Sequence, residues 1–209
     1  MLGSLRWPHN IRSTYESNIP MTASKPQLLG ISGSLRRSSF NTAVLASLAE
    51  AVADRVTLEI FRLNDVPLYD QDDDRDVPPP AVAVLWQAIT RADGIVISSP
   101  EYNFGVSGVL KNALDWASRP RGKSKLTGKP VLTMTASTAF TGGARAQVQL
   151  SETLTAIAAR VVLRPQIVIA SVHEKIKEGR LADAATLDLL VAGVDDLLRD
   201  IGWTAAAIT

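Results

Sequence analysis

Residues 27–41 read QLLGISGSLRRSSFN, and TAVLASLAEAVA follows at 42–53. The first six residues have the length and apolar character of a strand, and the later stretch has the spacing of a helix. The loop between them holds one glycine, three serines and two arginines. A helix start presents unpaired N–H groups and the positive end of the helix dipole, so the stretch predicts a phosphate-binding loop. The alternative is an ordinary strand-to-helix turn with serine caps and solvated arginines.

The composition of the chain excludes several classes of protein. It has 209 residues, 46% of them hydrophobic, which favours one globular domain with a buried core. The formal net charge is +1, so the charge balance indicates no nucleic-acid partner. Cysteine is absent, which excludes disulfides, zinc–thiolate sites and a cysteine nucleophile, and we expect a cytoplasmic protein. No apolar run approaches the ~20 residues that a membrane span needs, so no membrane partner is expected.

The first residues differ in pattern from the rest of the chain. Residues 1–24 show no clear periodicity and lack the apolar core of a signal peptide. Met21 opens a stretch that resembles a natural start shortly before the first strand. We therefore expect a disordered N-terminal extension at 1–24 and a single domain at 25–209. The alternative for the extension is an arm that packs on a partner subunit.

Apolar runs and helical patterns alternate along the domain. Strands that alternate with helices are typical of a parallel sheet covered on both faces. Right-handed crossovers then favour an α/β, flavodoxin-like three-layer sandwich with a five-stranded parallel sheet in the order 2-1-3-4-5. The predicted strands are 27–32, 56–61, 93–100, 130–137 and 160–170, the last interrupted at Pro165, and the predicted helices are 42–53, 81–92, 108–117, 141–159 and 181–202.

Three unusual loops leave the same edge of such a sheet, after strands one, three and four. The first is the serine- and arginine-rich loop at 33–41. The second, PEYNFGVSG at 100–108, places an acid, an aromatic ring and an amide at the turn. The third, TASTAFTGGARAQ at 135–147, carries paired glycines at a helix start. Because ligands bind beyond the carboxyl ends of parallel strands, the three loops predict one site.

The chemistry of these loops suits a flat heteroaromatic phosphate ester. Asn103 and backbone N–H groups can bind the polar rim of a ring, while Tyr102 or Phe104 can cover its face. The first loop lacks the GxxxxGK[ST] spacing of a P-loop and the GxGxxG of a dinucleotide-binding turn. The pattern therefore favours flavin mononucleotide (FMN).

At these residues the chain resembles the NAD(P)H-dependent FMN reductases of flavodoxin-like fold, whose relatives include quinone, chromate and azo reductases. The resemblance covers about residues 27–172. It implies an FMN enzyme that takes hydride from NADPH or NADH and passes electrons to a small-molecule acceptor, as a homodimer or homotetramer. The motifs that carry it are GSLRxxSxN at 33–41, PLYDQD at 67–72, ADGIVISSPEYN at 92–103, GVLKNALDW at 108–116 and GGARAQ at 142–147.

The resemblance also implies which residues hold the cofactor. Ser34, Arg36, Ser39 and Asn41 would bind the phosphate, and Arg37 is the arginine expected to be solvated. The second and third loops would line the ring and the ribityl chain, with no catalytic side chain and no metal. The full set of candidate cofactor-binding residues is Ser34, Leu35, Arg36, Arg37, Ser38, Ser39, Phe40, Asn41, Pro100, Glu101, Tyr102, Asn103, Ser137, Gly142 and Gly143.

Some features leave alternatives open. The family usually has serine and proline where this chain has Gly105 and Ser107, and a glycine at Ala139, which affects the acceptor pocket. We expect the helix start at Gly143 to meet negative charge on the reduced ring. The basic stretch at 119–125 can attract the 2′-phosphate of NADPH or be a plain solvated loop.

Two other functions are compatible with the predicted fold. A flavodoxin-type electron carrier would need a docking face, usually strongly acidic, and the near-neutral charge argues against it. A flavin-free interaction domain would have lost its cofactor, which the intact phosphate loop disfavours.

Overall fold

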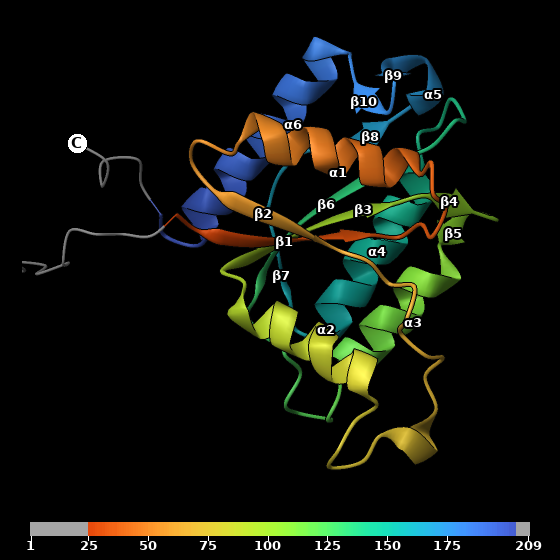
Figure 1. Cartoon of the computed structure of the whole chain (residues 1–209), viewed down its shortest axis with the longest axis vertical. Helices are drawn as coiled ribbons and strands as arrows, with labels where there is room; N and C mark the ends of the chain where they lie inside the picture. The colour runs from red at the N-terminus through yellow and green to blue at the C-terminus, as the bar shows by residue number, and fades with distance from the viewer. Residues whose placement is uncertain (1–24, 204–209) are drawn as a thin grey trace, which may run out of the picture.

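A computed structural model describes residues 25–203, so the predicted extension at 1–24 lies outside the described residues. The main sheet is parallel and runs in the order β2-β1-β3-β6-β7, with β8 also paired to β6 (Figure 1). This confirms the predicted order, with the fifth position shared by two short strands. The strands are β1 (Gln27–Ser32), β2 (Thr57–Phe61), β3 (Gly94–Ser99), β6 (Pro130–Ala136), β7 (Arg160–Val161) and β8 (Ile167–Ile169).

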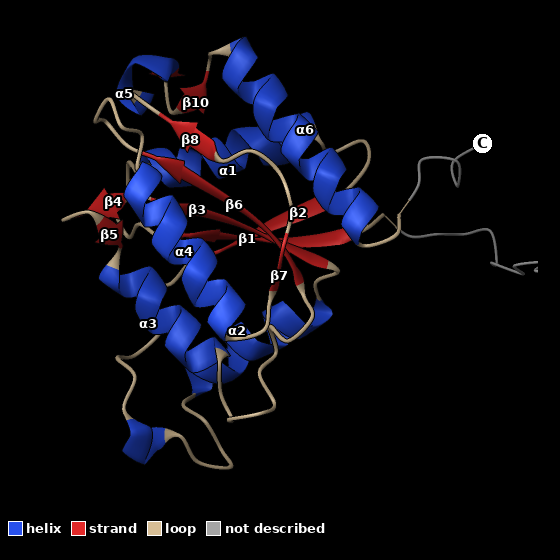
Figure 2. Cartoon of the chain, turned by 180° about the vertical axis from the view of Figure 1, so that it is seen from behind, coloured by secondary structure: helices blue, strands red, loops and turns tan. Residues whose placement is uncertain are grey.

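Helices cover both faces of this sheet and bury a separate core on each. One core lies under α1 and α6 and includes Leu48 and Leu190, while the other lies under α2, α3 and α4 and includes Leu85 and Leu150. Figures 1 and 2 show these two layers from opposite sides. No helix within residues 25–203 is long and apolar enough to span a bilayer. The helices are α1 (Phe40–Ala51), α2 (Pro80–Arg91), α3 (Gly108–Ala117), α4 (Ala144–Ala156) and α6 (Ala184–Asp200).

Several short elements lie outside the predicted pattern. The helix predicted at 181–202 begins later, at Ala184, because residues 180–181 pair in a hairpin and Asp183 caps the helix. Two-residue strands give no periodicity, so the sequence pattern could not reveal them. These elements are β4 (Glu101–Tyr102), β5 (Gly105–Val106), α5 (Val172–Lys175), β9 (Ile176–Lys177), β10 (Arg180–Leu181) and a 3₁₀ turn, η1 (Gln71–Asp73).

The β9–β10 hairpin is fastened to α1. The Leu181 N–H donates to the Ser47 hydroxyl at 2.9 Å, and the Arg180 guanidinium pairs with the Glu50 carboxylate at 2.9 Å. α1 also packs against α6, and both helices contribute to the same core. The helix that follows the first loop is therefore held between the sheet and the C-terminal part of the chain.

Candidate functional site

Three loops leave one edge of the sheet because β1, β3 and β6 end in register. Ser32 lies beside Ser98, and Ser99 lies beside Thr135. The loops that follow at 33–39, 100–107 and 137–143 therefore start side by side. In Figure 1 the β4–β5 hairpin and the start of α1 lie at this end of the sheet.

The start of α1 offers free hydrogen-bond donors. Ser39 is the N-cap, and its hydroxyl accepts the Thr42 N–H at 3.2 Å. This cap begins the helix two residues before its predicted start. Within residues 25–203, the Phe40 and Asn41 N–H groups have no hydrogen-bond acceptor. Two donors and the positive end of the helix dipole thus face the loop, as an anion site requires.

Asn41 sits at this helix start, but its side chain points into the protein. The residue is 4% exposed, and its amide donates to the Ala136 carbonyl at 3.1 Å. Its side-chain oxygen accepts the Ser98 hydroxyl at 2.8 Å. The Asn41 side chain therefore joins α1 to β6 and β3, and its backbone N–H is the group left for an anion.

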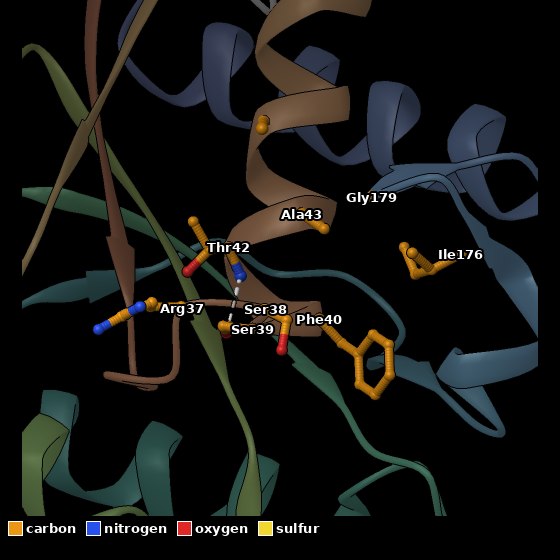
Figure 3. A pocket seen from close by; sticks show the side chains of 9 residues that line it. Arg37, Ser38, Ser39, Phe40, Thr42, Ala43, Ile176 and Gly179 are labelled. Atoms are coloured by element: carbon orange, nitrogen blue, oxygen red, sulfur yellow. Dashed lines mark hydrogen bonds between the residues drawn. The ribbon is translucent and has the colours of Figure 1, made fainter.

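The two adjacent arginines lie differently. The Arg36 guanidinium carbon is 5.6 Å from the centre of the Phe40 ring. Figure 3 shows the Arg37 side chain extending away from Phe40 and Ile176. A cavity of about 330 Å³ lies between the first half of α1 and the β9–β10 hairpin, where it is lined by residues 37–40 and by Ile176 and Gly179.

The second loop is a hairpin whose tip presents aromatic rings. Tyr102 is 51% exposed and Phe104 is 69% exposed. Asn103 and Phe104 form the turn with left-handed φ values of 50° and 66°. The Arg145 guanidinium of α4 lies 4.0 Å from the centre of the Phe104 ring, which steadies the tip.

Glu101 changes the expected chemistry of the third loop. Its carboxylate accepts the backbone N–H groups of Arg145 and Ala146, each at 3.0 Å. These are donors of the first turn of α4, the helix start at which we expected negative charge on the cofactor to be met. Because a carboxylate of the protein takes these two donors, the expectation stays a prediction that rests on the Gly143 N–H, which has no acceptor in the described residues.

A second contact explains the glycine at position 105. The Gln149 side-chain oxygen accepts the Val106 N–H at 2.6 Å. A Cβ at Gly105 would lie 2.8 Å from that same oxygen, so the glycine leaves room for the contact. The β4–β5 hairpin is therefore joined to α4 at both of its strands, by Glu101 and by Gln149.

The paired glycines of the third loop permit close packing that other residues would not. Gly142 and Gly143 have φ values of 60° and 95°. A Cβ at Gly142 would lie 2.8 Å from the Ala170 nitrogen, and one at Gly143 would lie 2.9 Å from the Thr135 Cβ. Nearby, the Ser137 hydroxyl accepts the Ala139 N–H at 3.1 Å, which shapes the start of this loop.

The basic stretch at 119–125 lies at the amino ends of the strands, opposite the three loops. It follows the C-terminal end of α3 and precedes Pro130, where β6 begins. Arg119 forms an ion pair with the nearly buried Asp74, and the hydrogen bond to that carboxylate raises the pKa of Arg119. α3 has 10 residues and spans about 15 Å, so within one chain this stretch is remote from the three loops.

Sequence reasoning missed three hydroxyls at the edge. Ser32 ends β1, Thr42 lies in the first turn of α1, and Ser107 caps α3. The Ser107 position carried a readable signal, because a serine directly before a helical pattern favours an N-cap. The other two gave no local signal, since their partners are set by the folded loop.

Comparison with known proteins assigns this arrangement to a family. Residues 26–174 match the family described as NADPH-dependent FMN reductase, which is more than half of the chain. The chain belongs to this family. Membership makes it an oxidoreductase that uses FMN, with NAD(P)H as co-substrate.

Individual members of the family support the assignment. An NAD(P)H-dependent FMN reductase of Pseudomonas aeruginosa is 38% identical over 165 residues, 78% of this chain and 89% of its own. A quinone reductase of Escherichia coli is 40% identical over 170 residues, 79% of this chain and 90% of its own. The solved flavoenzyme NAD(P)H:(acceptor) oxidoreductase FerB of Paracoccus denitrificans is 30% identical with a TM-score of 0.77, covering 85% of this chain and 97% of that one.

The residues at the edge fit an FMN reductase. The α1 start has two N–H groups without an acceptor in the described residues, beside exposed Ser38 and the two arginines, which suits a phosphate. Exposed Tyr102 and Phe104 provide apolar faces of the size of a flat ring. The left-handed conformation of Gly143 brings its backbone close to Glu101 of the second loop, where a Cβ would lie 3.5 Å from the Glu101 Cβ.

Proposed function

We propose that this FMN reductase binds its cofactor across the three loops of the carboxyl edge and reduces small quinone-type acceptors. The phosphate lies at the start of α1, on Ser34, Arg36, Ser39 and the Asn41 backbone. The ring lies between the β4–β5 hairpin and the third loop. The proposed contacts include Leu35, Arg37, Ser38, Phe40, Pro100, Glu101, Tyr102, Asn103, Ser137, Gly142 and Gly143.

One observation supports this proposal most directly. In the described residues, the Phe40 and Asn41 N–H groups in the first turn of α1 have no acceptor, whereas Glu101 takes the Arg145 and Ala146 N–H groups of α4. Arg36 and Arg37 follow each other in the loop directly before it. An anion with two or three free oxygens is the ligand that such a group of donors favours.

The chain's own residues bind and orient, while the chemistry is that of the cofactor. When bound, FMN accepts hydride from NAD(P)H and returns the electrons to an acceptor. Arg36 and the α1 N–H groups hold the phosphate, which fixes the cofactor along the edge. Glu101 and Gln149 hold the hairpin to α4, so that Tyr102 and Phe104 form a wall of fixed position.

The acceptor class follows from the relatives and from the openness of the site. The E. coli relative is named a quinone reductase, and flat quinones match the exposed aromatic faces of Tyr102 and Phe104. No residue at the edge selects one quinone, so free flavin, azo compounds and chromate are further acceptors to assay. We also propose that the protein is cytoplasmic and that it forms a homodimer or homotetramer. Light scattering of the purified protein tests the oligomeric state.

The test is the visible spectrum of the purified protein before and after NADPH is added without oxygen. A yellow protein that bleaches, and then recovers its colour when benzoquinone is added, supports the proposal. A yellow protein that NADPH does not bleach contradicts the reductase assignment. A protein that stays colourless after incubation with FMN contradicts the cofactor site.

A further inference from the structure

A buried hydroxyl connects the second loop to the first. Ser107 is 1% exposed and caps α3, and its hydroxyl donates to the Gly33 carbonyl at 2.6 Å. The same oxygen accepts the Leu110 N–H at 3.4 Å, a long contact and so the weaker of the two. The principal partner of the Ser107 hydroxyl is therefore the first residue of the phosphate loop, 74 positions away in the chain.

Both backbone groups of Gly33 are held by this edge of the protein. The Gly33 N–H donates to the Ser98 carbonyl at 2.8 Å, while its carbonyl accepts from Ser107. A Cβ on Gly33 would lie 3.1 Å from the Ser107 oxygen and 3.1 Å from the Pro100 Cδ. The glycine therefore allows the close approach that the hydrogen bond needs.

The hydrogen bond from Ser107 to the Gly33 carbonyl also sets the direction in which the Ser34 N–H points. In a planar trans peptide, the carbonyl of Gly33 and the N–H of Ser34 point to opposite sides. With the carbonyl directed to Ser107, the Ser34 N–H points to the α1 side, where it donates a long hydrogen bond to the Ser32 hydroxyl oxygen at 3.4 Å. Ser34 thus presents its N–H on the side where α1 begins.

The connection continues into the first turn of α1. The Thr42 hydroxyl donates to the Ser32 oxygen at 2.9 Å, and the Thr42 N–H donates to the Ser39 cap. Residues 34–38 between these fixed points are mostly exposed. The course of this exposed segment therefore depends on the anchors at its two ends, and Ser107 provides one of them.

We propose that Ser107 is a positioning residue for the phosphate loop. It acts through the Gly33–Ser34 peptide, whose N–H it directs toward the anion at the start of α1. The inference rests on the proposed function, since it concerns the binding of the FMN phosphate. It predicts that loss of the hydroxyl weakens FMN binding even where the fold is as stable as before.

Two substitutions separate positioning from stability. Ser107→Ala removes the hydroxyl and the helix cap. Ser107→Pro removes the same groups, but the φ of −58° at Ser107 is one that proline adopts, and Val106 before it is extended. Because proline also restricts the unfolded chain, we expect Ser107→Pro to be more stable than Ser107→Ala.

The measurements are the FMN dissociation constant of the apoprotein, its thermal midpoint, and the ³¹P chemical shift of bound FMN. Both variants should bind FMN about threefold to tenfold more weakly, the loss expected for one hydrogen bond, with a changed ³¹P shift. Ser124→Ala is the matched control, because that hydroxyl also donates to a carbonyl, of Ala117, and accepts an N–H, of Leu126, at the other edge. It should lower the midpoint and leave FMN affinity unchanged.

The outcomes are distinct. If both variants bind FMN as tightly as the parent, or if FMN affinity merely follows the thermal midpoint across the three variants, Ser107 has no positioning role. That result leaves the proposed function standing, provided the parent binds FMN. If the parent itself fails to bind FMN, the proposed function fails and the positioning role with it.

Discussion

The helices α1 and α4 both begin at the carboxyl edge, and their first turns are completed in different ways. In α1 the Ser39 hydroxyl takes one N–H group, and two more have no acceptor in the described residues. In α4 the Glu101 carboxylate takes two N–H groups. Both starts have the sequence features of an anion site, yet in α4 two first-turn N–H groups are already taken by the protein. A side chain from another loop decides which first-turn N–H groups are left for a ligand.

The largest effect should come from the conformation that begins α4. Gly142→Ala places a Cβ 2.6 Å from Val168 and 2.8 Å from the Ala170 nitrogen, at a φ of 60°. We expect the free energy of unfolding to fall by about 3 kcal/mol, measured by urea denaturation. Gly108→Ala is the control, because a Cβ there meets nothing within 4 Å. Equal stability of the two variants would show that α4 can begin without a glycine at position 142.

Substitutions of the two arginines before α1 test whether the start of this helix binds the FMN phosphate. Arg36→Ala should weaken FMN binding by about ten- to hundredfold, because it removes a charge-assisted phosphate bond. Arg37→Ala is the comparison variant, because Arg37 borders the proposed site but is the arginine expected to be solvated, and its side chain lies away from Phe40 (Figure 3). We expect it to change the FMN dissociation constant far less in a fluorescence titration of the apoprotein. The reverse order of the two variants would reassign the phosphate contact to Arg37.

Removing the Glu101 carboxylate tests its role as the acceptor for the first-turn N–H groups of α4. Glu101→Ala leaves two first-turn N–H groups of α4 without their acceptor, so the apoprotein should lose about 1 kcal/mol of stability. Glu101→Gln keeps an acceptor oxygen and should lose less. Glu152→Ala, at an exposed position later in α4, controls for loss of charge and should change little. If denaturation shows Glu101→Ala to be as stable as the parent, Glu101 does not cap this helix.

The smallest expected effect concerns the start of α6, where Asp183 should make the free energy of unfolding depend on pH. Hydrogen bonds from Thr186 and then Lys175 lower the pKa of Asp183 from 3.8 to about 2. Because the unfolded chain binds a proton more readily, this contribution is complete above pH 4 and is lost as the pH falls to about 2. Asp183→Asn should therefore flatten the curve of unfolding free energy against pH in this window, measured by urea denaturation. Parallel curves for Asp183→Asn and the parent would contradict this.

The sequence predicted the framework of the molecule better than the details of its site. Strands 27–32 and 93–100 were readable because parallel strands buried on both faces are continuous apolar runs. The capping role of Glu101 was not readable, since its partners lie 44 and 45 residues away. Gln149 and Gly105 are likewise brought together only by the fold. Local patterns identify elements, while contacts between loops decide which polar groups remain free for a ligand.

The fastening of α1 to the β9–β10 hairpin and α6 has a consequence for the order of synthesis. The phosphate loop and α1 emerge early from the ribosome, but Ser47 and Glu50 find their partners only when residues 180–181 have been made. α6, which completes the core under α1, emerges later still. A nascent chain therefore carries the whole loop sequence well before it can hold the loop in place. Capture of the cofactor should accordingly be one of the last steps in the maturation of this protein.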